Sequence, residues 1–257
     1  MKPAIAVALW GALVVFGNAA HAQCVGDPGP GGGAVDNRRS EGVSEQGITL
    51  GKSPPDVVVR IAHVNADMAQ CAGKMMGAFA VDNSIVSAAL GSARRTADAE
   101  STAGEVIFAV CRPAAKGSDV LLLGAASEAR VVTRHLDILT RAIPGSQEGG
   151  ASLQRQRRTS CRAPWHTYHG SGIDRGTMAQ CIGAARAVVR NSSVASEDPT
   201  HFVLLAKDQQ TTVAITCYQD GAGVAVLVAA VSFGGSQQGQ KIYSAALDQL
   251  RAKLPIR

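Results

Sequence analysis

The sequence predicts an α+β protein made of two similar modules, each with the element order (β)-α-β-β-α and an antiparallel sheet covered by two helices. The first observation behind this prediction is a repeated motif, because MAQCAG at 68–73 recurs as MAQCIG at 178–183. The second is that further matches follow in the same order and at near-constant spacing: Cys111 with Cys217, Leu123–Ser127 with Val228–Ser232, and Leu136–Leu139 with Leu247–Leu250. Helical patterning alone would not repeat two cysteines in this way, so we interpret the pattern as an internal duplication of two modules rather than as a solenoid.

Each copy begins with an amphipathic helix that places its cysteine on the buried face. Apolar residues recur along this helix at helical spacing, in the first copy at Met68, Cys71, Met75 and Phe79. Asp67 and Thr177 stand just before the two helices and are suitable N-caps. An extra strand is expected before each helix, at 56–61 in the first copy and, with a weaker pattern, at 164–168 in the second.

Apolar strands follow the first helix of each copy. We expect them at 105–111 and 119–125 in the first copy, and at 201–205, 211–217 and 223–231 in the second. Asp220-Gly221 is a strong hairpin signal between the last two strands. A closing helix ends each copy shortly before a proline, at 129–143 and 241–254. Two strands alone are marginally stable, so the extra strand or the partner module must complete each sheet.

Composition shifts divide the chain into five parts. We expect a signal peptide at 1–22, an irregular N-terminal segment at 23–53, module 1 at 54–144, a linker at 145–160 and module 2 at 161–257. The linker is rich in Gly, Ser and Gln and then becomes basic, which is typical of an exposed connection.

The first 22 residues have the three parts of a secretory signal peptide. Lys2 is followed by an apolar run at 4–17 and by an A-x-A cleavage site at Ala20–Ala22. We therefore expect cleavage after Ala22 and a periplasmic or secreted mature protein. The apolar run is short for a membrane span, so no span is expected in the mature chain. A high Arg-to-Lys ratio and many alanines favour a bacterial source.

Export favours disulfides over free thiols, and the duplication assigns them. Cys71 is equivalent to Cys181, and Cys111 to Cys217, so the symmetric pairing is Cys71–Cys111 and Cys181–Cys217. The remaining two cysteines, Cys24 and Cys161, pair with each other if both are oxidised. No C-x-x-C spacing occurs, which leaves a zinc site or a thioredoxin-like pair without support.

Composition excludes several function classes. The net charge is only +5, which is too mild for the footprint of a nucleic-acid-binding protein. Aromatic residues make up 4% of the chain, which argues against a lectin or an aromatic RNA-binding platform. The glycine-rich stretch at 234–241 lacks the Gly-Lys-Ser/Thr ending of a phosphate loop, and we expect it to be a turn. No cofactor is therefore expected.

The densest group of candidate functional side chains lies at the start of module 2. This candidate binding patch consists of Trp165, His166, Tyr168 and His169. On a turn the two histidines are suitable metal ligands, but on a strand His166 and Tyr168 share one face while His169 points away. No third ligand is evident, so no metal is expected. The other histidines, at 63, 135 and 201, are scattered singly.

No catalytic residues can be assigned from the motifs. Ser171 lies in GSG rather than in the G-x-S-x-G of a nucleophile elbow, and no pair of carboxylates stands out. We therefore expect a non-enzymatic exported protein that binds a protein or envelope ligand, with an inhibitor or immunity-type role as one form. The alternatives are a periplasmic hydrolase that uses His166, His169 and Ser171 or Asp174, and a structural component of the envelope.

Overall fold

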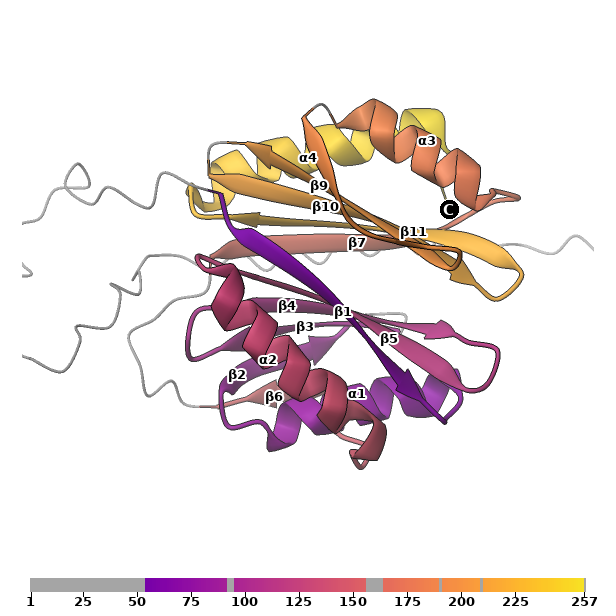
Figure 1. Ribbon diagram of the computed structural model, residues 1–257. Coiled ribbons are helices and arrows are strands. Elements are labelled where there is room, and N and C mark those ends of the chain that lie inside the picture. Colours follow the sequence, from indigo (N-terminus) through magenta and orange to yellow (C-terminus); the bar gives the residue numbers. More distant parts are fainter. Residues whose placement is uncertain (1–53, 92–94, 156–163, 190, 209, 257) are drawn as a thin grey trace, which may run out of the picture.

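The computed structural model describes residues 54–91, 95–155, 164–189, 191–208 and 210–256 (Figure 1). The expected signal peptide, the N-terminal segment with Cys24, and Cys161 lie outside these residues. Module 1 consists of β1 (Asp56–Val64), α1 (Met68–Val81), β2 (Ile85–Leu90), β3 (Thr96–Ser101), β4 (Val106–Pro113), β5 (Ser118–Ala126) and α2 (Ala129–Ala142). Module 2 consists of β7 (Trp165–Ile173), α3 (Met178–Val188), β8 (Ser192–Asp198), β9 (His201–Asp208), β10 (Thr211–Asp220), β11 (Gly223–Ser232) and α4 (Gly235–Lys253).

The predicted fold class is correct, and both modules share the order β-α-β-β-β-β-α. Each forms one antiparallel sheet, with strand order β1-β5-β4-β3-β2-β6 in module 1 and β7-β11-β10-β9-β8 in module 2. The sequence interpretation missed β2, β3 and β8. These strands read IVSAAL, TADAES and SSVASED, and residues such as Ala, Ser and Asp have low strand propensity. Their pairing with β4 and β9 makes them strands in spite of this composition.

The first helix of each module begins at the expected cap. The Asp67 carboxylate accepts a hydrogen bond from the Gln70 N–H, and Thr177 forms a reciprocal capping box with Gln180. The last helix, α4, begins at Gly235, so the expected turn at 234–241 is instead its first two turns. Gly239 is required there, because a Cβ atom would overlap the Trp165 ring. No helix in the described ranges is long and apolar enough to cross a membrane.

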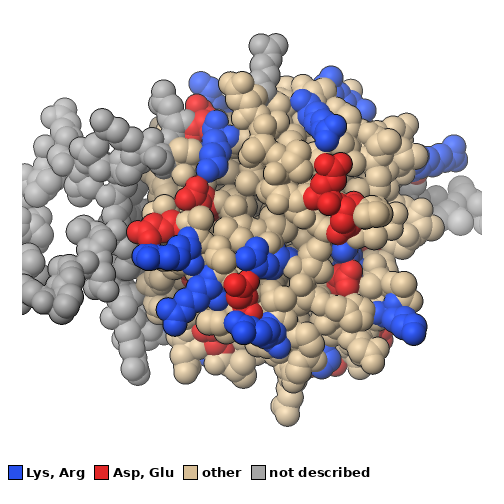
Figure 2. Space-filling view, viewed as in Figure 1, with Lys and Arg blue, Asp and Glu red and all other residues tan. Residues whose placement is uncertain are grey.

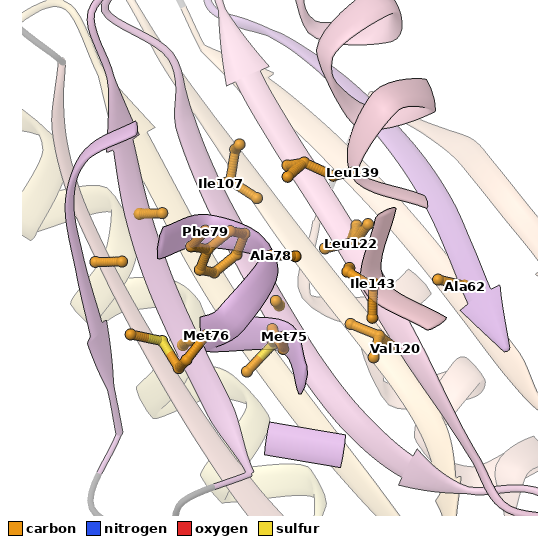
Figure 3. Packing of buried hydrophobic residues seen from close by; sticks show 14 of the residues in the cluster. Ala62, Met75, Met76, Ala78, Phe79, Ile107, Val120, Leu122, Leu139 and Ile143 are labelled. Atoms are coloured by element: carbon orange, nitrogen blue, oxygen red, sulfur yellow. The ribbon is translucent and has the colours of Figure 1, made fainter. Parts of the chain in front are cut away.

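Each module buries a core between its helices and the outer face of its sheet. In module 1, Met75, Met76 and Phe79 of α1 pack on Ile107 and other strand residues (Figure 3). The module 2 core has the same arrangement beneath α3 and α4. A disulfide joins the first helix to the fourth strand of each module. Cys71 pairs with Cys111 and Cys181 with Cys217, with Cα–Cα distances of 6.1 and 6.0 Å.

The two sheets pack against each other through their inner faces, so the molecule has four layers with helices on both outer sides (Figure 1). A third apolar cluster fills this interface. It includes Phe108 and Leu123 of the module 1 sheet, here called sheet A, and Leu205 and Leu227 of the module 2 sheet, here called sheet B. The cavity left between the sheets has a volume of only about 10 Å³. Strands buried on both faces explain why β4, β5, β10 and β11 are nearly continuous apolar runs.

Polar contacts around the apolar interface between the two sheets also hold the modules in register. The buried Arg112 side chain of β4 donates to the Thr200 carbonyl at 2.8 Å and to the Thr200 hydroxyl at 2.6 Å. Arg95 pairs with both Asp220 oxygens at 2.9 Å. These contacts and the apolar layer fix the placement of one module on the other.

Part of the expected linker belongs to module 1. Residues 146–155, here called the strap, cross α1 and then pair with the outer edge of β2 as strand β6 (Ser152–Gln154). The Gly149 N–H donates to the Gly73 carbonyl at 2.8 Å, and a Cβ atom on Gly77 would overlap the Gln147 carbonyl oxygen. The Arg155 side chain donates to the carbonyls of Ala80, Asp82 and Ile85. A flexible-linker composition therefore forms an ordered cover, because α1 offers two glycines at its surface.

Candidate functional site

Strand β7 carries all four residues of the candidate binding patch, but it divides them between its two faces. Trp165, His166, Tyr168 and His169 are each half-buried. His166 and Tyr168 face sheet A, where both rings contact Phe108 edge-on at centroid distances of 5.8 and 5.7 Å. His169 and Trp165 lie on the opposite face, under α4. The alternation expected for a strand is therefore present, and the four side chains do not form one surface.

The inner-face pair is surrounded by the acidic residues of β3. The His166 imidazole lies 3.7 Å from Asp98 and 4.0 Å from Glu100, and its Nδ1 is 3.2 Å from the Pro164 carbonyl oxygen. Burial disfavours the charged ring, but the two carboxylates outweigh it and raise the pKa of His166. Burial also raises the pKa of Tyr168. These groups form a satisfied polar contact between the modules.

The outer-face pair has a different electrostatic environment. The His169 Nε2 lies 2.7 Å from the Ser171 hydroxyl, on the same face of β7. Burial and the nearby Arg251 guanidinium both lower the pKa of His169, which favours a neutral ring at pH 7. A neutral imidazole that is hydrogen-bonded to a serine hydroxyl can act as the general base that activates this nucleophile for acyl transfer. Ser171 is only 9% exposed beneath α4, which leaves little room for a substrate carbonyl.

Sequence reasoning missed a second cluster, centred on His135 of α2. Its Nε2 lies 2.8 Å from Asp82, and its Nδ1 makes a very short hydrogen bond to Glu105. His135 and Glu105 are buried. Burial opposes the charged ring, but the two carboxylates raise the pKa of His135 to about 9. The pKa of Asp82 falls to about 2, because hydrogen bonds from His135 and Ser84 outweigh its burial.

This second cluster superficially has the composition of a Ser-His-Glu triad. The Ser84 hydroxyl is 3.1 Å from the His135 Nε2, and Glu105 holds the other ring nitrogen. The Ser84 hydroxyl, however, donates to Asp82 at 2.6 Å, and the imidazolium donates to carboxylates from both nitrogens. A ring protonated at both nitrogens cannot accept a proton from serine, so the cluster acts as a buried ionic clamp. Within the described ranges, no group of three or more His, Cys, Asp or Glu side chains is arranged to hold a metal ion.

Among the longer edge strands of the described residues, β8 has more exposed residues than β1 or β7. Strand β8 forms an edge of sheet B, and five of its seven residues are exposed. Val194 of this strand is 48% exposed, as one of four large apolar side chains with such exposure in the described chain. On the face shown in Figure 2, acidic and basic side chains are interspersed rather than gathered by sign. An open edge presents unpaired backbone N–H and C=O groups that another strand can bind.

Comparisons with known proteins give no family. No family model matches the chain, and no curated protein matches it. Among solved structures, the di-domain ARO/CYC BexL from the BE-7585A biosynthetic pathway is 11% identical, with 77% of this chain and 93% of that chain covered and a TM-score of 0.28. DynU16, from the dynemicin biosynthetic locus, is 10% identical (78% and 98% covered, TM-score 0.27). The di-domain ARO/CYC StfQ from the steffimycin pathway is 9% identical (76% and 97% covered, TM-score 0.23). TM-scores this low carry no information about the activity of this chain.

Proposed function

We propose that this chain is an exported, non-enzymatic bacterial binding protein whose partner is a polypeptide held at the protein surface. The observation that carries the proposal is the open edge of β8, where a row of backbone groups and the half-exposed Val194 face solvent. The inner faces of both sheets are covered by each other, and their outer faces by helices. Strand addition at an edge is a recurrent way for such sheets to bind peptides.

The two disulfides support a periplasmic or secreted location of the protein. Structural disulfides persist in oxidising compartments, and each one here ties a helix to a buried strand. Together with the expected cleavage after Ala22, they favour a periplasmic or secreted protein. Mass spectrometry of the protein from the envelope fraction should find Gln23 as the mature N-terminus, and a retained Met1 would contradict export by cleavage.

The binding proposal is tested by photo-cross-linking in the native envelope. A photoreactive amino acid is placed in turn at the four exposed apolar positions, Val81, Val131, Ile138 and Val194. A discrete adduct with another polypeptide at any of these positions is the expected result. Ile138 is 47% exposed on α2 and Val194 is 48% exposed on β8, so these two positions form a matched pair. Absence of adducts at all four positions would contradict the proposal.

A second candidate function, hydrolysis, is favoured by one contact, the 2.7 Å distance between Ser171 and His169. A serine activated by a neutral imidazole reacts with fluorophosphonate probes. We expect no adduct on Ser171 in the wild-type protein, because α4 covers it. A probe adduct on Ser171 that disappears in the His169→Ala variant would establish the hydrolase instead.

A further inference from the structure

Module 2 repeats the surface that the strap covers in module 1. By the repeated motif, Gly183 of α3 is the counterpart of Gly73, Ala187 is the counterpart of Gly77, and β8 is the counterpart of β2. In the described residues no strand pairs with the outer edge of β8, and nothing lies within 4 Å of a Cβ atom built on Gly183. The same two elements are thus covered in one module and open in the other.

The fold of module 2 alone gives no reason for Gly183. A glycine in the middle of a helix lowers helix stability relative to alanine, because its backbone is freer in the unfolded chain. At Gly73 this loss of helix stability is offset, because the missing side chain lets the strap pack closely on α1. A Cβ atom there would lie 2.8 Å from the Glu148 side chain. Gly183 is exposed and has no such neighbour in the described chain.

We propose that Gly183, Ala187 and the outer edge of β8 dock an extended segment of a separate polypeptide whose chemistry resembles that of the strap. Such a segment has small residues where it crosses α3, then a short strand antiparallel to β8, and then a basic residue. This inference rests on the proposed function and names its surface. The strap itself, with sequence SQEGGASLQR, is the internal example of a ligand for this arrangement of helix and edge.

The pairing of β6 with β2 shows where the end of the docked segment lies. Gln154 lies opposite Ser87, and the Arg155 N–H donates to the Val86 carbonyl at 2.8 Å, so the strap ends at the start of β2. The corresponding place in module 2 is the start of β8, next to the C-terminal end of α3. A basic residue that follows the docked strand can bind backbone carbonyls there, as Arg155 does in module 1.

Two differences from module 1 define how the ligand binds. Ala187 carries a Cβ atom where Gly77 has none, so the segment must cross α3 close to Gly183. Lys74, which donates to the carbonyls of Pro144 and Ser146, is replaced by Ala184. The docked segment therefore has fewer anchors than the strap and exchanges more easily. A second copy of this chain is a poor donor, because its own strap is already bound to its module 1.

The test uses a labelled strap peptide, SQEGGASLQR with blocked ends, and the full mature protein. We expect saturable binding in fluorescence anisotropy, and photo-cross-links from the peptide to 192–198. The Gly183→Leu variant should weaken binding by about tenfold or more, because leucine fills the crossing point while remaining a good helix former. Val194→Lys, which places a charge on the edge, should also weaken it and provides a second variant if the first fails to fold.

Two matched controls distinguish this surface from the rest of the protein. Ala252→Leu, at an exposed position of α4, should leave binding unchanged. A peptide with Leu153→Pro should not bind, because it lacks a strand N–H group.

Several outcomes would overturn the inference. They are equal binding to wild type and Gly183→Leu, cross-links to module 1 only, or no saturable binding. A concentration-dependent dimer that protects β8 without peptide would also overturn it, by making a second copy the occupant. Envelope adducts at Val131 or Ile138 but not at Val194 would keep the proposed function while rejecting this surface.

Discussion

The two modules share a backbone plan and a disulfide but differ in charge and in coverage. Module 1 buries an imidazolium between two carboxylates, whereas the counterpart of His135 in module 2 is the buried Ala246. The counterpart of Glu105 is Thr211, whose hydroxyl simply pairs with Ser232 at 2.8 Å. Module 1 also has the strap on α1 and β2. Module 2 thus reaches the same fold with the repeated order of helices, strands and cysteines alone, and within the described residues the ionic clamp and the strap occur in module 1 only.

The largest effect should come from breaking the clamp. His135→Ala leaves Asp82 and Glu105 as unpaired carboxylates, and removal of one partner of a buried charge pair costs about 3–5 kcal/mol of unfolding free energy. The double variant His135→Ala/Glu105→Thr copies module 2 and should recover part of this loss, because a buried charge is removed. Urea unfolding measures both. A double variant less stable than the single one would contradict the account of the clamp.

The clamp should also make the unfolding free energy of the wild type depend on pH in a way that the double variant His135→Ala/Glu105→Thr lacks. The pKa of His135 rises from 6.5 to about 9 on folding, so its contribution is complete below pH 6.5 and is lost as the pH rises through 9. The pKa of Asp82 falls from 3.8 to about 2, so its contribution is lost as the pH falls from about 4 toward 2. Unfolding free energies of wild type and His135→Ala/Glu105→Thr should therefore converge between pH 6.5 and 9. A constant difference over that range would rule out a charged His135.

Removal of either disulfide should destabilise the protein by a similar amount, slightly less than loss of the clamp does. The bonded cysteines are 40 and 36 residues apart, and loops of this length stabilise the folded state by about 3–4 kcal/mol. Cys71→Ser/Cys111→Ser and Cys181→Ser/Cys217→Ser should thus lower the melting temperature by similar amounts, in one cooperative transition shared through the apolar layer between the sheets. Calorimetry that resolves two separate transitions would show instead that the modules unfold independently.

The repeated helices and cysteines could be predicted from the sequence, whereas side-chain clusters whose members lie far apart in the chain could not. The doubled MAQC motif located both helices and both disulfides, and period-two alternation correctly separated His169 from His166 and Tyr168. His135 looked isolated because its partners, Asp82 and Glu105, lie 53 and 30 residues away. Strand β3 was missed because Asp98 and Glu100 fill positions that face the other module. The apolar runs of β4 and β10 carried a readable signal for two-sided burial, and with it for the packing of the sheets.

The smallest of these effects should come from the strap anchor. Arg155→Ala removes hydrogen bonds to the carbonyls of Ala80, Asp82 and Ile85. Net hydrogen-bond contributions of this kind imply a loss of about 1–2 kcal/mol. Peptide-resolved hydrogen exchange should show faster exchange in β2 and at the end of α1, with module 2 unchanged. Exchange that rises equally in both modules would mean that Arg155 supports the whole molecule rather than the strap.

Hydrogen exchange along β2 and β8 tests the central difference between the modules most directly. The β2 edge is paired with the strap, through contacts such as the 2.9 Å bond from the Leu90 N–H to the Ala151 carbonyl. We expect slow exchange in 85–90 and fast exchange in 192–198 of the free protein, with protection of 192–198 when the strap peptide is added. Equal protection of both strands without peptide, or no change in 192–198 at saturating peptide, would contradict it.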